Sequence, residues 1–169
     1  MKKLFSLISL ALLTLSCGAS LFCQPAHAVR DSDDYRTYYN SRFAFYISYP
    51  ANVFTPQGES DNGDGQRFVS KDGRAEMTAS GINNALDETL ADWYAEASRS
   101  TAEHPHRVVT YKTMKANWFV VSGHEGERLF YQKTMLKNNI FKTFRIEYDR
   151  ALKSKYDPIT ARMAGSFKG

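Results

Sequence analysis

Residues 128–149 decide the fold, and they read RLFYQKTMLKNNIFKTFRIEYD. Asn138 and Asn139 at the centre favour a tight two-residue turn, because asparagine tolerates the positive φ angles that such a turn requires. The two arms, 128–137 and 140–149, alternate apolar and polar residues over several positions. They are therefore predicted to form a pair of antiparallel strands.

Both faces of this predicted hairpin carry large apolar side chains. Side chains alternate between the two faces of a strand, so Leu129 and Tyr131 lie opposite Phe130 and Leu136. A sheet with two apolar faces needs cover on both of them. We therefore expect an α+β fold, with a mainly antiparallel sheet covered by helices on both faces.

Working outward, the sequence predicts five more strands and two irregular segments. The strands are 43–49, 67–70, 74–82, 107–115 and 118–122, and Trp118 in the most apolar of them is expected to be largely buried. Lys71-Asp72-Gly73 is a strong signal for a hairpin turn. Residues 29–40 are expected to be a mobile start, and the stretch 51–66, which is rich in glycine and proline, a long loop.

Two helices are expected. The first covers about 86–101, where apolar residues recur at helical spacing and Asp87 and Glu88 suit a helix N-terminus. The second is expected to begin at Asp157-Pro158, read as the N-cap and first turn, and to run towards Phe167. The predicted order is β-β-β-α-β-β-β-β-α.

Two segments resemble the PsbP-like group, which are small exported proteins named for an extrinsic subunit of photosystem II. Residues 39–50 are similar to the opening strand of that group, and 156–167 to its terminal helix, which closes on a Ser-Phe pair. The resemblance covers 39–54 and 117–167, together with the order of the elements between them. It implies an α-β-α sandwich that serves in scaffolding, chaperoning or partner binding more often than in catalysis. The motifs of the photosynthetic members are not recognisable here, so their function is not carried over.

The N-terminus has the features of a signal peptide. Lys2 and Lys3 precede an apolar run from Leu4 to Leu15, which is shorter than the roughly 20 residues that a membrane span needs. Ala26-His27-Ala28 then offers a cleavage site. We expect residues 1–28 to be a signal peptide, 29–169 to be a single domain, and the protein to be periplasmic or secreted.

Both cysteines, Cys17 and Cys23, precede this cleavage site. The mature chain would therefore lack disulfides, thiolate nucleophiles and cysteine ligands for zinc. The alternative is a lipoprotein signal in which Cys17 is lipidated, and only in that case is a membrane anchor expected.

The composition is that of an ordinary globular domain. Of the 169 residues, 43% are apolar and 24% charged, which excludes wholesale disorder. The whole chain has 22 basic and 18 acidic residues. Removal of Lys2 and Lys3 with the signal peptide lowers the net charge from +4 to +2.

One loop partly mimics a calcium-binding loop. Ser60, Asn62 and Asp64 supply oxygen ligands at positions 1, 3 and 5, and Asp61 lies between them. The twelfth position, where a bidentate glutamate is required, is Lys71. Weak calcium binding at Ser60, Asp61, Asn62 and Asp64 is one interpretation, and a solvated turn is the other; no other cofactor is expected.

Basic residues gather in the last third of the chain. The segment 128–155 holds eight cations against Glu147 and Asp149. Lys133, Lys137, Lys142 and Arg145 are the candidate binding residues for an acidic envelope or secreted protein. The alternative is a solubilising hairpin with lysine-protected edges. Nucleic acid is not expected as a partner of an exported protein.

Catalytic and zinc-binding signatures are weak. His104 and His106 are two residues apart and would share a face in an extended chain, but no third ligand is evident, and a polar loop explains them. No Gly-x-Ser-x-Gly motif is present, and Ser122-Gly123-His124-Glu125 is explained by a strand-to-turn junction. Sequence alone does not bring two carboxylates together.

The leading hypothesis is therefore an exported, non-catalytic binding or accessory protein of the cell envelope. One alternative is an inhibitor or immunity-type protein that blocks a toxic enzyme. Another is a small hydrolase that uses loop carboxylates or a weakly bound calcium ion, which would require a concave pocket lined by perturbed acids.

Overall fold

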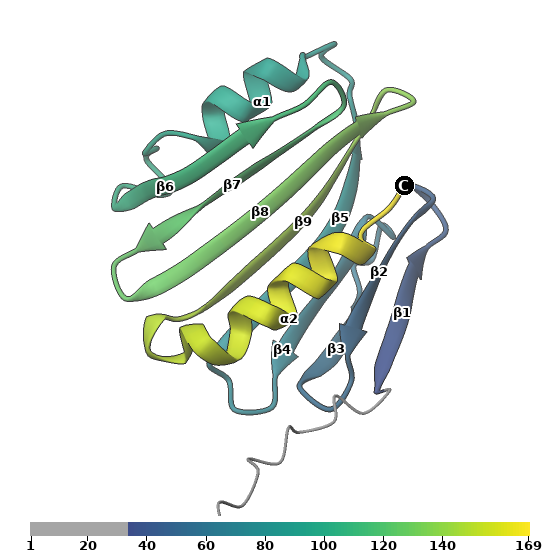
Figure 1. Cartoon of the computed structure of the whole chain (residues 1–169). Helices are drawn as coiled ribbons and strands as arrows, with labels where there is room; N and C mark the ends of the chain where they lie inside the picture. The colour runs from purple at the N-terminus through teal and green to yellow at the C-terminus, as the bar shows by residue number, and fades with distance from the viewer. Residues whose placement is uncertain (1–33) are drawn as a thin grey trace, which may run out of the picture. The chain divides into compact units, whose positions relative to one another are not determined.

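The computed structural model describes residues 34–169 (Figure 1). The elements are β1 (Tyr35–Asn40), β2 (Phe45–Pro50), β3 (Phe54–Glu59), β4 (Gly65–Ser70), β5 (Ala75–Asn83), α1 (Leu90–Ala97), β6 (Arg107–Met114), β7 (Trp118–Glu125), β8 (Arg128–Lys137), β9 (Ile140–Asp149) and α2 (Lys153–Ser166), with a 3-10 turn at 150–152. The described residues belong to one compact unit. The expected signal peptide and both cysteines lie outside the described residues. Among the described helices, none is long and apolar enough to cross a bilayer.

Seven strands form one antiparallel sheet, in the order β3-β4-β5-β9-β8-β7-β6. The predicted hairpin β8–β9 is confirmed: Lys137 pairs with Ile140, and Asn138 and Asn139 have φ angles of 54° and 58°. The hairpin β4–β5 is confirmed in the same way, with Gly73 at a φ of +68°. β1 and β2 form a separate two-stranded ribbon.

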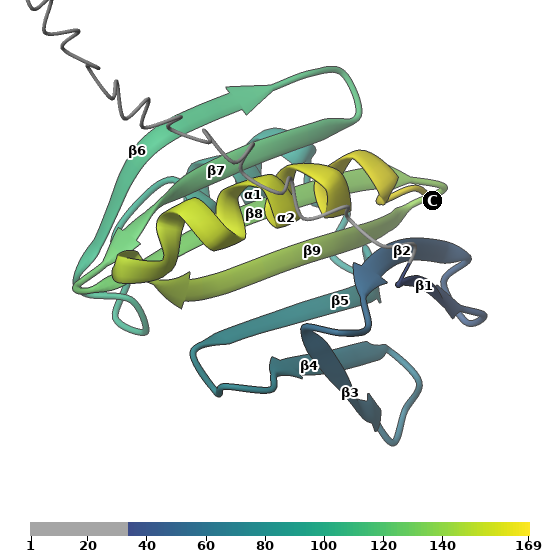
Figure 2. The same ribbon diagram turned by 60° about the horizontal axis from the view of Figure 1, so that its bottom comes forward.

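Each face of the sheet has its own core. On one face, α2 and the ribbon β1–β2 pack against residues such as Phe68, Met77 and Phe144. On the other face, α1 packs against Phe119 and Phe130. Figure 2 shows α2 in front of the sheet and α1 behind it.

Complete helical cover of both faces is not found. α1 packs mainly over β7, and Trp93 reaches Phe141 at the start of β9. Farther along that face, β5 and β9 carry polar side chains in cross-strand pairs, such as Thr78 with Arg145 and Glu76 with Glu147. The predicted α+β, mainly antiparallel architecture is thus confirmed, and half of the α1 face is a polar surface.

Two strands were not predicted. Residues 35–40, expected to be mobile, form β1, because Tyr38 and Asn40 are buried and pair with β2. Part of the expected loop 51–66 forms β3, in which Phe54 anchors an otherwise exposed edge strand. Because β3 has a single buried residue and contains Pro56, its sequence shows no alternation of apolar and polar residues from which a strand could be predicted.

Both helices differ from their predicted bounds. α2 begins at Lys153, so Asp157-Pro158 lies inside the helix and does not form its start. α1 begins at Leu90, because Thr89 and Asp92 form a capping box and Asp87 has a φ of 52°. Trp118 is also more exposed than expected, whereas its neighbour Phe119 is fully buried.

Asp72 ties the β4–β5 turn to α2. It accepts hydrogen bonds from Ser70 Oγ (2.6 Å) and the Arg74 amide (3.1 Å), and Lys155 Nζ lies 3.0 Å from its second oxygen. These hydrogen bonds, that from Ser70 first, hold the pKa of Asp72 well below its ordinary value of 3.8. Because the folded-state pKa is depressed, the stabilisation is present above the unfolded-state pKa and is lost as the pH falls.

We expect Asp72→Asn to lower the free energy of unfolding by about 1 kcal/mol at pH 7, a value discounted for the exposure of this side chain. Urea denaturation should show the difference shrinking as the pH falls towards 2. Asp61→Asn, at an exposed carboxylate, is the matched control and should change little at either pH. A difference for Asp72→Asn that persists unchanged in acid would contradict this role.

Candidate functional site

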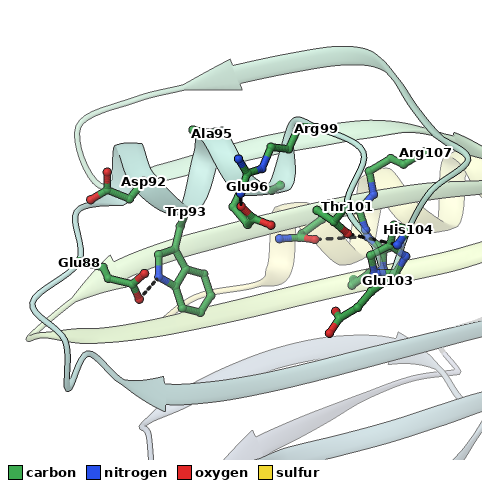
Figure 3. A pocket seen from close by; sticks show the side chains of 13 residues that line it. Glu88, Asp92, Trp93, Ala95, Glu96, Arg99, Thr101, Glu103, His104 and Arg107 are labelled. Carbon is green, nitrogen blue, oxygen red and sulfur yellow. Dashed lines mark hydrogen bonds and ion pairs between the residues drawn. The ribbon is translucent and has the colours of Figure 1, made fainter.

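A groove of about 690 Å³ lies between α1, the loop that follows it and the sheet (Figure 3). Its lining combines acidic, basic and aromatic side chains. They are Glu88, Asp92, Trp93, Ala95, Glu96, Ala97, Arg99, Thr101, Glu103, His104, Arg107, Gln132 and Arg145. The groove opens where the cover of α1 ends and the polar half of the same face begins.

The wall on the α1 side is aromatic. The Trp93 ring stacks on Phe141 of β9, with centroids 4.0 Å apart and an interplanar angle of 13°. Its Nε1 donates a hydrogen bond to Glu88 Oε2 at 2.9 Å, which fixes the orientation of the indole. Figure 3 shows Trp93 and Glu88 at one end of the groove and His104 and Arg107 at the other.

The end of the groove that holds His104 and Arg107 is called its inner end here. There, two guanidinium groups contact the same aromatic ring. Arg107 of β6 and Arg145 of β9 lie 5.4 Å and 4.8 Å from the centroid of Phe130 on β8. Such cation–π contacts are worth more when the cation is shielded from water. The Arg107 side chain is only 6% exposed and that of Arg145 17%. Packing therefore holds both guanidinium groups in fixed positions.

Glu125 at the end of β7 lies between these cations. Its Oε1 accepts a hydrogen bond from Arg107 Nε at 3.0 Å and lies 3.5 Å from Arg145 Nη2, while its Oε2 lies 3.0 Å from His104 Nδ1. Burial alone would raise the pKa of Glu125, but the hydrogen bonds from Arg107 and His104 outweigh it and hold the pKa below its ordinary value. Glu125 is therefore ionised at neutral pH.

The ion pairs continue across the polar half of the face. Glu147 accepts hydrogen bonds from Arg145 at 2.8 Å and 2.6 Å and lies 3.7 Å from Arg128. Asp149 then bridges Arg128 at 3.2 Å and Arg74 at 2.7 Å. The inner end of the groove is thus one end of a continuous charged network that runs over β6, β7, β8 and β9 to Arg74 in the β4–β5 turn.

The predicted basic residues do not form one surface. Lys133, Lys137 and Lys142 lie on the α2 face, whereas Arg145 lies on the opposite face. Lys133 Nζ donates to the carbonyl of Ala164 (2.8 Å), Lys137 Nζ to that of Gly169 (2.7 Å) and Lys142 Nζ to that of Ala44 (3.3 Å).

Lys133 satisfies a carbonyl in the last turn of α2, where a positive charge is favourable, and Lys137 one at Gly169. Lys142 satisfies a carbonyl in the turn between β1 and β2. Burial lowers the pKa of Lys133 and of Lys142. Partner binding by Lys133, Lys137, Lys142 and Arg145 stays a prediction, and it would have to use two separate faces.

The candidate calcium loop is the turn between β3 and β4. Asp64 pairs with Arg42 at 2.9 Å and accepts a hydrogen bond from Asn62 Nδ2 at 2.5 Å, while Asp61 is exposed. Ser60 Oγ lies 3.3 Å from the Gly65 amide, within the same turn. Among residues 34–169, no three His, Cys, Asp or Glu side chains are grouped as metal ligands are. Calcium binding here stays a prediction.

The three histidines of the described chain lie at two different places. His104 belongs to the groove, while His106 and His124 line a separate hollow beside Arg150. Residues 101–106 form an irregular connection after α1, as the polar-loop interpretation predicted.

Sequence reasoning missed the groove. The sequence predicts Glu125 in a turn and Arg107 at the start of a strand. Their side chains meet only because β6 and β7 pair from Arg107 with Glu125 onward. The one usable signal was the charged residues at alternate positions of the last strand, Arg145 and Glu147, which share a face.

Comparison with solved structures found a similarity to the solution structure of cyanobacterial PsbP (CyanoP) from Synechocystis sp. PCC 6803. The TM-score is 0.59, and the match covers 80% of this chain and 92% of that one. No family model matches the chain, and neither does any curated protein. At 10% sequence identity the likeness shows the fold alone. The chain therefore has a PsbP-like fold, as the sequence resemblance predicted.

Proposed function

We propose that this protein is an exported, non-catalytic binding or accessory protein of the cell envelope, and that the groove beside α1 receives its partner. The observation that carries the proposal is the inner end of the groove. There Arg107 and Arg145 are held on Phe130 and oriented by Glu125 and Glu147. Side chains fixed in this way bind without a large loss of conformational entropy.

The chemistry of Glu125 favours binding over hydrolysis. A general acid needs a raised pKa to hold its proton at neutral pH. The pKa of Glu125 is lowered, and both of its oxygens face cations. This carboxylate suits the orientation of arginines better than proton transfer. An inhibitor of a toxic enzyme is a special case of the same proposal, with the enzyme as partner.

Blocking the groove tests the proposal. Ala95 is exposed on α1 and lines the groove without joining the ion-pair network. Ala95→Arg is expected to reduce capture of a specific partner from envelope extract at least tenfold, because the long side chain fills the groove while the fold is kept. Mass spectrometry of the captured proteins measures the effect.

Thr55→Arg, on the exposed edge strand β3, is the matched control and should capture the partner as the wild type does. Equal capture by the wild type and both variants would reject the groove as the binding surface. Unchanged thermal melting of Ala95→Arg shows that any loss does not arise from unfolding.

A further inference from the structure

We propose that the inner end of the groove binds a carboxylate, held by the two Nη nitrogens of Arg107, with the apolar body of the ligand lying towards Trp93. This inference rests on the groove being the binding surface and assigns the chemical class of what it binds. The ligand is an organic acid with a single carboxylate, either free or as the C-terminus of a peptide.

The first argument is the unused hydrogen-bonding capacity of Arg107. A guanidinium has five N–H donors, and in the described chain only Nε of Arg107 donates to a protein acceptor, Glu125. The side chain is 6% exposed, yet its nitrogens are not sealed off: the fully buried polar side-chain atoms without a partner, among residues 34–169, belong to Ser98, His124 and Thr160. Arg107 lines both this groove and the hollow beside Arg150, and we infer that its Nη groups face the groove.

The second argument is the charge of the network. From the groove to its far end, four guanidinium groups are joined by three carboxylates, those of Glu125, Glu147 and Asp149. The guanidinium groups belong to Arg74, Arg107, Arg128 and Arg145. One positive charge is left over within this network even when His104 is neutral. Among the other acids of the groove lining, Glu88 accepts a hydrogen bond from Trp93, Asp92 accepts one from Thr89, and Glu96 pairs with Arg99. Glu103 is the remaining carboxylate of the lining and competes with the ligand for this charge.

The third argument is shape. A planar guanidinium edge matches a carboxylate in a bidentate pair, which is among the stronger hydrogen-bonded arrangements in proteins. The Trp93 ring, held in place by its stacking on Phe141, supplies an apolar surface in the same groove. Its volume of about 690 Å³ lies in the range of small-molecule sites. These features together favour a carboxylate on an apolar body over inorganic phosphate or sulfate.

Phenylacetate is the probe, and phenylacetamide, which has the same shape without the charge, is its control. Two-dimensional ¹H–¹⁵N NMR of the protein, titrated with each compound, gives the dissociation constants. We expect phenylacetate to shift the Arg107 Nε–H resonance and to bind at least tenfold more tightly than phenylacetamide. Equal affinity for the two compounds would overturn the proposal.

Three variants locate the site. Arg107→Lys keeps the charge beside Glu125 but loses the planar pair, and it should weaken phenylacetate binding about tenfold, the factor expected when one charge-assisted hydrogen bond is lost. Arg67→Gln removes an arginine that lies outside the groove and is paired with Glu76, and it should bind within twofold of the wild type. Glu103→Gln removes a competing carboxylate from the lining and should bind more tightly. Wild-type affinity in Arg107→Lys would refute the assignment.

Ala95→Arg provides a second route if Arg107→Lys does not fold, because it blocks the groove and leaves the ion pairs in place. It should abolish phenylacetate binding, and retained binding would refute the site.

A short peptide ending in phenylalanine, as free acid and as amide, separates the two sources: tighter binding of the peptide acid than of phenylacetate indicates a chain terminus. Partner capture that depends on the groove, without any carboxylate affinity, would overturn this inference and leave the proposed function standing.

Discussion

Replacing Phe119 by alanine is expected to lower the free energy of unfolding by about 3–5 kcal/mol. In a marginally stable domain, a loss of this size leaves a large fraction of the molecules unfolded. Phe119 is fully buried beneath α1, in the cluster that also contains Leu90 and Ala97, and its ring lies 5.5 Å from that of Tyr94. The loss combines the transfer energy of the ring with the cavity left under a helix that is only eight residues long. Urea denaturation followed by circular dichroism measures it.

Trp118→Ala is the matched comparison, because the two residues are neighbours on β7 and face opposite sides of the sheet. Trp118 is half-buried, and its indole lies 5.9 Å from Lys133 Nζ. Its truncation should cost less than half as much as that of Phe119, although tryptophan is the larger residue. Equal losses in the free energy of unfolding would contradict the deeper burial of Phe119 relative to Trp118.

Glu125→Gln is expected to cost about 2–4 kcal/mol, because breaking a partly buried ion pair leaves its cations without compensation. Arg107 loses its carboxylate partner, Arg145 keeps Glu147 but loses the contact at 3.5 Å, and His104 loses a hydrogen-bond partner. The side chain of Glu125 is 26% exposed, so solvent reduces the effect below that of a fully buried pair. Urea denaturation at pH 7 measures the loss.

The pH dependence of this loss has a definite sign. Because the pKa of Glu125 is lowered in the folded protein, its stabilisation is present above the unfolded-state pKa and is lost as the pH falls. The wild type and Glu125→Gln should therefore converge in stability towards pH 3. The double variant Glu125→Gln, Arg107→Gln should lose less than the sum of the single losses, because the two residues are in contact. Additive losses would contradict the coupling.

Local sequence was sufficient for the centre of the sheet. The turn at Asn138-Asn139 and the alternation on both sides of it predicted the β8–β9 hairpin, because strand pairing across a two-residue turn is a short-range property. The same holds for Lys71-Asp72-Gly73. The apolar residues on both faces of β8 correctly predicted that each side of the hairpin would be covered.

Where local signals competed with tertiary packing, the prediction was wrong. Asp157-Pro158 suits a helix start, yet α2 begins at Lys153 and places Tyr156 in the core against Tyr148. β1 has no strong strand pattern of its own, and it is ordered because Tyr38 is buried and donates a hydrogen bond to Glu59 at 2.7 Å. These choices depend on partners that are distant in sequence.

The sequence by itself determined the PsbP-like α+β class, the central hairpins and the order of most elements, because periodicity and turn chemistry are encoded within about ten residues. Only the tertiary structure decided which charges meet. It turned Lys133, Lys137 and Lys142 towards backbone carbonyls on the α2 face and brought Arg107, Glu125 and Arg145 together from three strands. Charged side chains follow no period that identifies their partners. The groove therefore exists only once the pairing of β6, β7, β8 and β9 has set their register.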